Sequence, residues 1–223
     1  DLEVEESAVG NQPLAVTHVR EVHLIRNVIM KLQVEQKDGT TVPLDVTCDG
    51  RFRCQLLGGP DDPAAETLGS FEDNVVVVRT FAPGITDRLS CDALDLYLAK
   101  PDGDETPVIS ITSAEAGAQD AADSLFGTDS QDLQLRRMVA AGNLILLESA
   151  ADNLVARVGV REGAPPLPTT IDYQFDQKRA ILNKFDPVFL KKTRPENLPR
   201  VLITQPDVRI DCLQVELLHD GQN

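Results

Sequence analysis

The chain has 223 residues, of which 42% are hydrophobic and only 4% aromatic, and it contains no tryptophan. This length and hydrophobic content are enough to bury a core, which excludes wholesale disorder. The formal net charge of −15 argues against nucleic acid as the main partner, because phosphate binding needs a basic surface. The sequence has no run approaching the about 20 apolar residues of a membrane-spanning helix, so we expect no transmembrane segment.

The N-terminal segment is acidic and without a clear period. It lacks the basic and apolar regions of a signal peptide. We expect a mature chain or a fragment of a longer protein, and favour the fragment. Residues 1–19 are predicted to be an irregular lead-in to a domain over residues 20–218.

An alternation of apolar and polar residues runs from Val22 to Val34, broken only by Arg26. This period of two predicts a long strand with one dry face. Turn signals at Asp38-Gly39 and Asp49-Gly50 each lead into another alternating segment. The pattern is typical of consecutive antiparallel strands.

The middle of the chain continues this pattern. Residues 71–80 predict another strand. Leu89 and Cys91 then alternate, but the following leucines, from Leu94 onward, alternate on the opposite parity. This change of parity predicts a bulge near Asp92.

Residues 113–132 interrupt the pattern and are rich in alanine, aspartate, serine and glycine, which favours an irregular acidic insertion. Strand signals resume at residue 133 and continue to residue 218. The sequence therefore predicts an all-β fold, arranged as one domain or as two halves, 20–112 and 133–218.

Three short segments share one arrangement, an asparagine just before a run of aliphatic residues. They start at Asn27, Asn74 and Asn143. Recurrence of this kind is typical of stacked units that bury a shared core, so we expect the three segments to begin equivalent strands.

Cys48, Cys91 and Cys212 occupy similar places in a second recurring arrangement, and Cys54 stands outside it. Equivalent positions in stacked units can come close enough for a disulfide. The interpretation that we favour is that the cysteines are small apolar residues facing inward, because free cysteine is often buried.

Familiar catalytic and cofactor-binding motifs do not occur in the sequence. His18 and His23 are five positions apart, which places them on opposite faces of a strand and makes a metal pair unfavourable. The acidic run from Asp102 to Glu105 lacks the spacing of a calcium loop. We therefore expect no catalytic residue, no metal and no cofactor.

A basic segment stands out against the acidic chain. Between Lys178 and Arg200 it carries seven basic residues and only two acidic ones. One interpretation is contact with an anionic head group, and the other is a solvated loop that balances acidic neighbours. The candidate head-group contacts are Lys178, Arg179, Lys184, Lys191, Lys192 and Arg194.

The recurring segments resemble the OstA-like family. In that family a Gly-Asn-Val start is followed by a hydrophobic strand, a turn and small residues before alternating leucines. Phe71–Val78 and Asp87–Tyr97 are similar to this pattern, Ala141–Leu146 has the Gly-Asn start itself, and Leu154–Arg157 resembles the next strand.

The resemblance covers roughly residues 20–112 and 133–218. Arg26 and Asp73 stand where the family usually has glycine, and the insertion at residues 113–132 splits the series. These departures leave the number of repeats open.

The resemblance implies an open, folded-over antiparallel β-jellyroll that takes part in lipopolysaccharide transport in the periplasm. Its groove would shelter the acyl chains of an amphiphilic glycolipid, and its edge strands would join other β-jellyroll modules. A groove of this kind needs a wall of aliphatic side chains. The residues that we expect to line it are Val22, Leu24, Val28, Met30, Leu32, Val46, Val75, Val77, Leu89, Leu94, Leu96, Leu144, Leu146, Ile203 and Ile210.

Composition alone favours a different use of these residues, the filling of a closed β-sandwich core. The expected function is a non-enzymatic module of the periplasm or cell envelope that binds or relays a glycolipid. One alternative is a structural scaffold module of a larger envelope protein. The enzyme alternative is a carbohydrate-active enzyme on a β-jellyroll, which would need two carboxylates converging in a cleft.

Overall fold

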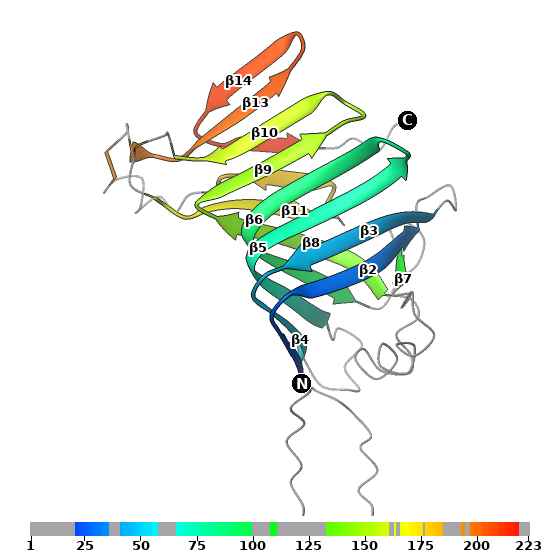
Figure 1. The fold of residues 1–223 in the computed structure, drawn as a ribbon. Helices are drawn as coiled ribbons and strands as arrows, with labels where there is room; N and C mark the ends of the chain where they lie inside the picture. The colour runs from blue at the N-terminus through cyan, green and yellow to red at the C-terminus, as the bar shows by residue number, and fades with distance from the viewer. Residues whose placement is uncertain are drawn as a thin grey trace, which may run out of the picture.

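The computed structural model describes residues 21–35, 41–57, 66–99, 108–110, 133–160, 163, 166–175, 177–184, 193–194 and 197–218. The predicted lead-in over residues 1–19 and the predicted insertion over residues 113–132 lie outside the described residues. The described strands pair antiparallel in one sheet of fifteen strands (Figure 1). The prediction of an all-β antiparallel fold is confirmed, and the sheet folds over until it is nearly closed, like a barrel or jellyroll.

The strands of the first half are β1 (Glu21–Ile25), β2 (Val28–Glu35), β3 (Thr41–Cys48), β4 (Arg51–Leu57), β5 (Glu66–Ala82), β6 (Ile85–Ala99) and β7 (Val108–Ser110). Those of the second half are β8 (Leu133–Gly142), β9 (Leu144–Ser149), β10 (Leu154–Gly159), β11 (Thr169–Gln174), β12 (Arg179–Leu182), β13 (Arg200–Gln205), β14 (Val208–Cys212) and β15 (Val215–Leu218).

The sheet is folded along one line into two layers. The first layer contains β2, β3, the second half of β5, the first half of β6, β9, β10, β13 and β14. The second layer contains β1, β4, the first half of β5, the second half of β6, β8, β11, β12 and β15. Figure 1 shows the first layer in front, with β8 and β11 of the second layer behind it. We call the fold line between the layers the seam.

At the seam the backbone adopts a left-handed conformation, with positive φ, that most residues avoid. Arg26 and Asn27 have φ of 73° and 50°, and Asp73 and Asn74 have φ of 64° and 51°. Two consecutive left-handed residues turn the strand sharply from one layer into the other. Glycine adopts this region without strain and asparagine and aspartate tolerate it, whereas a long side chain such as that of Arg26 is uncommon there.

The predicted single strand from Val22 to Val34 is wrong in one respect. It is two strands, β1 and β2, in different layers. Arg26 interrupts the dry row because it lies at the bend, where its amide donates to the carbonyl of Gly50 at 3.0 Å. The two residues inserted at the bend keep the parity of the alternation, so the sequence pattern runs through the bend unchanged.

The predicted change of parity near Asp92 is present. The pairing of β5 with β6 shifts between Glu72 and Val75, so that two residues of β5 oppose Asp92. As a result Cys91 and Leu94 both face inward, with exposed fractions of 5% and 1%. The one extra residue of this irregularity belongs to β5 rather than to β6.

Inward-facing side chains line up across the strands in rows, and the two rows nearest the seam in each layer are mostly apolar. In the first layer the row beside the seam is Val28, Cys48, Val75, Cys91, Ile145, Val158, Val201 and Cys212. The next row is Met30, Val46, Val77, Leu89, Leu147, Ala156, Ile203 and Ile210.

In the second layer the row beside the seam is Leu24, Phe52, Phe71, Leu94, Ala140, Ile171, Leu182 and Val215. The next row is Val22, Cys54, Gly69, Leu96, Met138, Tyr173, Ala180 and Leu217. Most of these side chains belong to one hydrophobic cluster that fills the space between the layers.

The recurring cysteines have one structural explanation. Cys48, Cys91 and Cys212 lie in the same row beside the seam, and Cys54 lies in the second layer. All four are free thiols, three of them buried. This arrangement supports the interpretation of the cysteines as small apolar residues that face inward.

Strand β7 closes the first half of the sheet. It pairs with β2 on one side and with β8 on the other. Because β8 also pairs with β6, the strands β6, β5, β3, β2, β7 and β8 form a closed ring. No corresponding ring forms among the described strands of the second half.

Candidate functional site

The two layers end together at β14 and β15, which we call the C-terminal end. Among the described strands each of these two has a partner on one side only, β13 for β14 and β12 for β15. Their inward residues Ile210 and Leu217 are 42% and 49% exposed. The residues paired with them, Ile203 and Ala180, are only 7% exposed. The apolar interior is therefore accessible at the last strand of each layer.

The opposite end of the layers, formed by β1 and β2, differs; we call it the N-terminal end. Its inward residues Val22 and Val28 are each 6% exposed, and Leu32 is 4% exposed. The row that ends exposed at Leu217 begins buried at Val22, whereas the row that ends exposed at Ile210 begins at Met30, which is half-buried. The last strand of each layer therefore exposes more of its inward apolar side chains than the first strand does.

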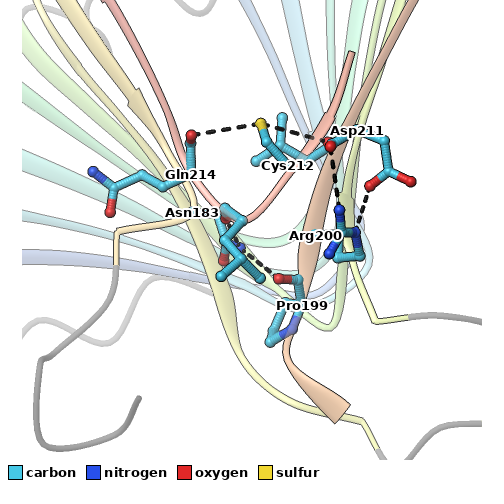
Figure 2. Close-up of polar contacts among 8 residues, drawn as sticks. Asn183, Pro199, Arg200, Asp211, Cys212 and Gln214 are labelled. Carbon is cyan, nitrogen blue, oxygen red and sulfur yellow. Dashed lines mark hydrogen bonds and ion pairs between the residues drawn. The ribbon is translucent and has the colours of Figure 1, made fainter. Parts of the chain in front are cut away.

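The seam at the C-terminal end is fixed by one side chain, Asn183 (Figure 2). Its amide nitrogen Nδ2 donates to the carbonyl oxygens of Pro199 at 3.0 Å and Leu213 at 2.7 Å. Asn183 is 1% exposed and has a φ of 64°. A buried polar group needs such partners, because leaving it unpaired costs free energy.

Ion pairs lie on the outer faces of both final strands. Arg200 pairs with Asp211 on β14, as Figure 2 shows, and Arg179 Nε lies 2.7 Å from Glu216 Oε1 on β15. Exposed pairs of this kind contribute about 0 to 1 kcal/mol each. Their charges face away from the interior, so they do not interrupt the apolar rows.

The four described basic candidates for head-group contact are not gathered on the inner face. Lys178 and Arg179 lie at the start of β12, and Arg179 is already paired with Glu216. Lys184 and Arg194 are exposed, and Lys191 and Lys192 lie outside the described residues. Their proposed role stays a prediction.

The side chains expected to line a groove fall into distinct groups. Leu24 and Met30 are half-buried and Ile210 is exposed. The remaining inward members are at most 8% exposed, and they are Val22, Val28, Leu32, Val46, Val75, Val77, Leu89, Leu94, Leu96 and Ile203. These ten side chains form the packed interior of the structure, and their contact with a lipid stays a prediction.

Leu144 and Leu146 do not face inward, and this part of the prediction is wrong. Ile145, with an exposed fraction of 0%, and Leu147 take the inward positions of β9, while Leu144 is 45% exposed. The reason lies at the seam. Asn143 does not have the positive φ of Asn27, so the strand after it starts on the opposite parity.

A third row of inward positions in the first layer has a polar middle. Leu44 pairs with Arg79, Arg79 with Asp87, and Asp87 with Ser149. Arg79 Nη2 donates to Asp87 Oδ2 at 2.7 Å, and the Arg79 guanidinium lies 4.3 Å from the centroid of the Phe81 ring. In the middle of the first layer, the inward side chains are thus apolar in the two rows beside the seam and polar in the third row.

Two residues of the candidate site were missed by sequence reasoning. Asn183 follows its aliphatic run instead of preceding it, so it did not match the recurring arrangement. Leu217 continues the alternation of the last strand, but the sequence contains no signal that distinguishes a terminal strand from a central one.

The described part of the chain holds no group of three or more His, Cys, Asp or Glu side chains placed to bind a metal ion. Within the same residues, no helix has the length and apolar character that crossing a membrane requires. Comparison of the chain with models of protein families, with curated proteins and with solved structures finds no match.

Proposed function

We propose that this chain is a non-enzymatic module of the periplasm or cell envelope that holds the acyl part of a lipopolysaccharide-like glycolipid between its layers. It would join other β-jellyroll modules through its edge strands. The OstA-like resemblance supplies the open jellyroll, the glycolipid and the location. The observation that carries the proposal is the accessible apolar interior at Ile210 and Leu217, beside two edges that have no further strand among the described residues.

The order of apolar and polar rows in the first layer, counted away from the seam, supports an amphiphilic ligand. Two apolar rows lie beside the seam, and the row of Arg79, Asp87 and Ser149 follows. An acyl chain against the apolar rows gains about 0.8 kcal/mol for each buried CH₂ group. A polar head group would then lie at the level of the polar row.

The test is a titration of the delipidated chain with lipopolysaccharide and with a fluorescent fatty-acyl probe. We expect saturable binding that Leu217→Asp weakens about tenfold or more, since one lost apolar contact is worth about 1.5 kcal/mol. Leu218→Asp is the matched control, because Leu218 lies next in the chain, points outward and is 70% exposed. Equal effects of the two substitutions would place binding elsewhere.

A second candidate function, a scaffold module without lipid transport, is favoured by a separate observation. The ten buried side chains of the predicted wall pack against one another in one hydrophobic cluster. A scaffold would show no saturable binding of either probe while unfolding cooperatively. The same titration therefore separates the two functions.

A further inference from the structure

We infer that the space between the two layers is divided by a packed section around Phe52 and Phe71, which blocks an acyl chain inside the sheet. The module then holds chains of limited length and does not pass them from one end of the sheet to the other. The inference rests on the glycolipid binding proposed above. It adds a limit on the ligand and names the side chains that set this limit.

Two of the seven phenylalanines of the chain lie at the centre of the packed section. Phe52 on β4 and Phe71 on β5 are each 1% exposed, and their ring centroids lie 4.6 Å apart. Both rings lie over Gly69 in the second row, where a Cβ atom would be 3.3 Å from Phe52 Cε2 and 4.0 Å from Phe71 Cε2. The two rings therefore fill a place in the second row as well as their own places beside the seam.

The packed section continues away from the seam. Along β6 the inward side chains of Leu94, Leu96 and Leu98 are 1%, 5% and 5% exposed. Leu133 and Leu135, at the end of β8 that lies far from the seam, are 7% and 6% exposed. At this distance from the seam β7 pairs with both β2 and β8 and closes the ring of strands (Figure 1). The section is thus packed from the seam to β7.

The interior is more accessible on both sides of the packed section. The half-buried inward side chains on its N-terminal side are Leu24, Met30 and Leu44. Those on its C-terminal side are Met138, Leu147, Leu154 and Tyr173. A ligand therefore finds accessible apolar side chains on either side of the packed section, but not within it.

This division limits the length of acyl chain that the module can cover. Each CH₂ group that is buried strengthens binding about fourfold. A chain that enters past Ile210 and Leu217 gains in this way until it meets Phe71 and Leu96, which are already packed. Further CH₂ groups stay in water. We therefore expect affinity to rise with chain length and then to reach a plateau.

The experiment titrates the delipidated chain with fluorescent fatty-acyl probes of increasing chain length. Phe71→Ala should move the plateau to longer chains, because Phe71 lies between Phe52 and Leu94 in its row. Phe71→Leu leaves a smaller gap and should move the plateau less, in the same direction. The matched control is Phe175→Ala, since the half-buried Phe175 packs on Tyr173 on the C-terminal side, with ring centroids 4.3 Å apart.

The control should leave the plateau at the wild-type chain length. A wild-type affinity that keeps rising with chain length would overturn the inference. So would a plateau that neither substitution of Phe71 moves, or one that Phe175→Ala moves equally.

Xenon tests the packed section without lipid. A closely packed interior has no room for xenon, whereas an apolar cavity left by a removed side chain binds it. By NMR we expect xenon to shift the methyl resonances of Leu94 in Phe71→Ala but not in the wild type. Equal shifts in the wild type would show that the section is open and would contradict the inference. Failure of every acyl probe to bind counts against the proposed function, whereas the xenon result decides on the packed section alone.

Discussion

The side-chain amide of Asn183 donates a 2.7 Å hydrogen bond to the backbone carbonyl of Leu213, thirty positions further along the chain. The same amide reaches the carbonyl of Pro199 at 3.0 Å. Between the first strands the seam is held by backbone bonds such as Arg26 to Gly50 and Asp49 to Asp73. At the C-terminal end the two side-chain bonds of Asn183 add to a backbone bond, from its own amide to the carbonyl of Thr170 at 2.6 Å.

Asn183→Gly should destabilise the chain by about 2 to 4 kcal/mol, because the carbonyl of Pro199, in a buried bond, and that of Leu213, in a partly buried one, lose their donor. Glycine keeps the φ of 64° accessible, so the loss reports the hydrogen bonds rather than backbone strain. Urea unfolding measures the change. Asn143→Gly is the control, since Asn143 is exposed and its side chain makes no hydrogen bond within the described residues. Equal losses in both variants would contradict the role of Asn183.

At Gly50, which also lies at the seam, there is no room for a side chain. A Cβ atom there would lie 2.4 Å from the Glu72 carbonyl oxygen and 2.5 Å from Asp73 Oδ2. Gly50→Ala should therefore cost about 1 to 3 kcal/mol or more, since the backbone of β5 must shift.

The control for this effect is Gly84→Ala at the β5–β6 turn. Gly84 has a φ of 82° with nothing within 4 Å of an added Cβ atom, so its cost comes from backbone conformation alone, about 1 kcal/mol. Thermal and urea unfolding compare the two variants. If Gly50→Ala lowered the free energy of unfolding less than Gly84→Ala does, the backbone around Gly50 would be able to shift at little cost.

Part of this architecture is predictable from the sequence because its signals are local. The period of two predicts the strands, and Asn27 and Asn74 predict their starts because asparagine tolerates left-handed backbone. The sequence pattern does not reveal the bend at Arg26, because two left-handed residues preserve the parity of the alternation. The opposite parity after Asn143 depends on a backbone conformation that no residue type dictates.

The candidate site was harder to predict for a different reason. Ile203 and Ile210 have similar sequence surroundings, yet one is 7% exposed and the other 42%. The difference comes from position in the sheet, because β13 has a strand on each side and β14 has β13 alone among the described strands. Burial of this kind is a property of tertiary neighbours, and single-sequence patterns do not contain it.

The pair of Arg137 and Asp172 predicts a large effect of a single substitution. The guanidinium donates to both carboxylate oxygens at 2.8 and 2.9 Å, and Asp172 is only 3% exposed. The hydrogen bond to Asp172 raises the pKa of Arg137 above its ordinary value. Arg137→Leu leaves a buried carboxylate without its cation and should cost about 3 to 5 kcal/mol.

Replacing both partners by leucine should restore most of that loss, because no uncompensated charge then remains. Arg53→Ala breaks the exposed pair with Glu21 and is the control, with an expected change of about 0 to 1 kcal/mol. Urea unfolding of the wild type and these three variants tests the prediction. A double variant no more stable than Arg137→Leu would mean that the loss comes from packing rather than charge.

Burial raises the pKa of the Cys54 thiol and of the Cys91 thiol to about 12, against 9.0 for an unperturbed cysteine. Between these values the unfolded chain has lost both protons while the folded chain keeps them. Stability that is fully present below pH 9.0 should therefore fall as pH rises towards 12. Each thiol should contribute a slope of about 1.4 kcal/mol for each pH unit.

The variant Cys54→Ala/Cys91→Ala isolates this contribution from the other groups that titrate in alkali. Below pH 9.0 its unfolding free energy should run parallel to that of the wild type, offset by the lost packing. Above that value the wild-type curve should fall more steeply, by about 2.7 kcal/mol for each pH unit. Urea unfolding in steps from neutral pH to moderately alkaline pH measures both curves. Curves that stay parallel throughout would mean that water reaches the thiols of Cys54 and Cys91. The rows between the layers would then be less closely packed than the exposed fractions of these two cysteines, 4% and 5%, indicate.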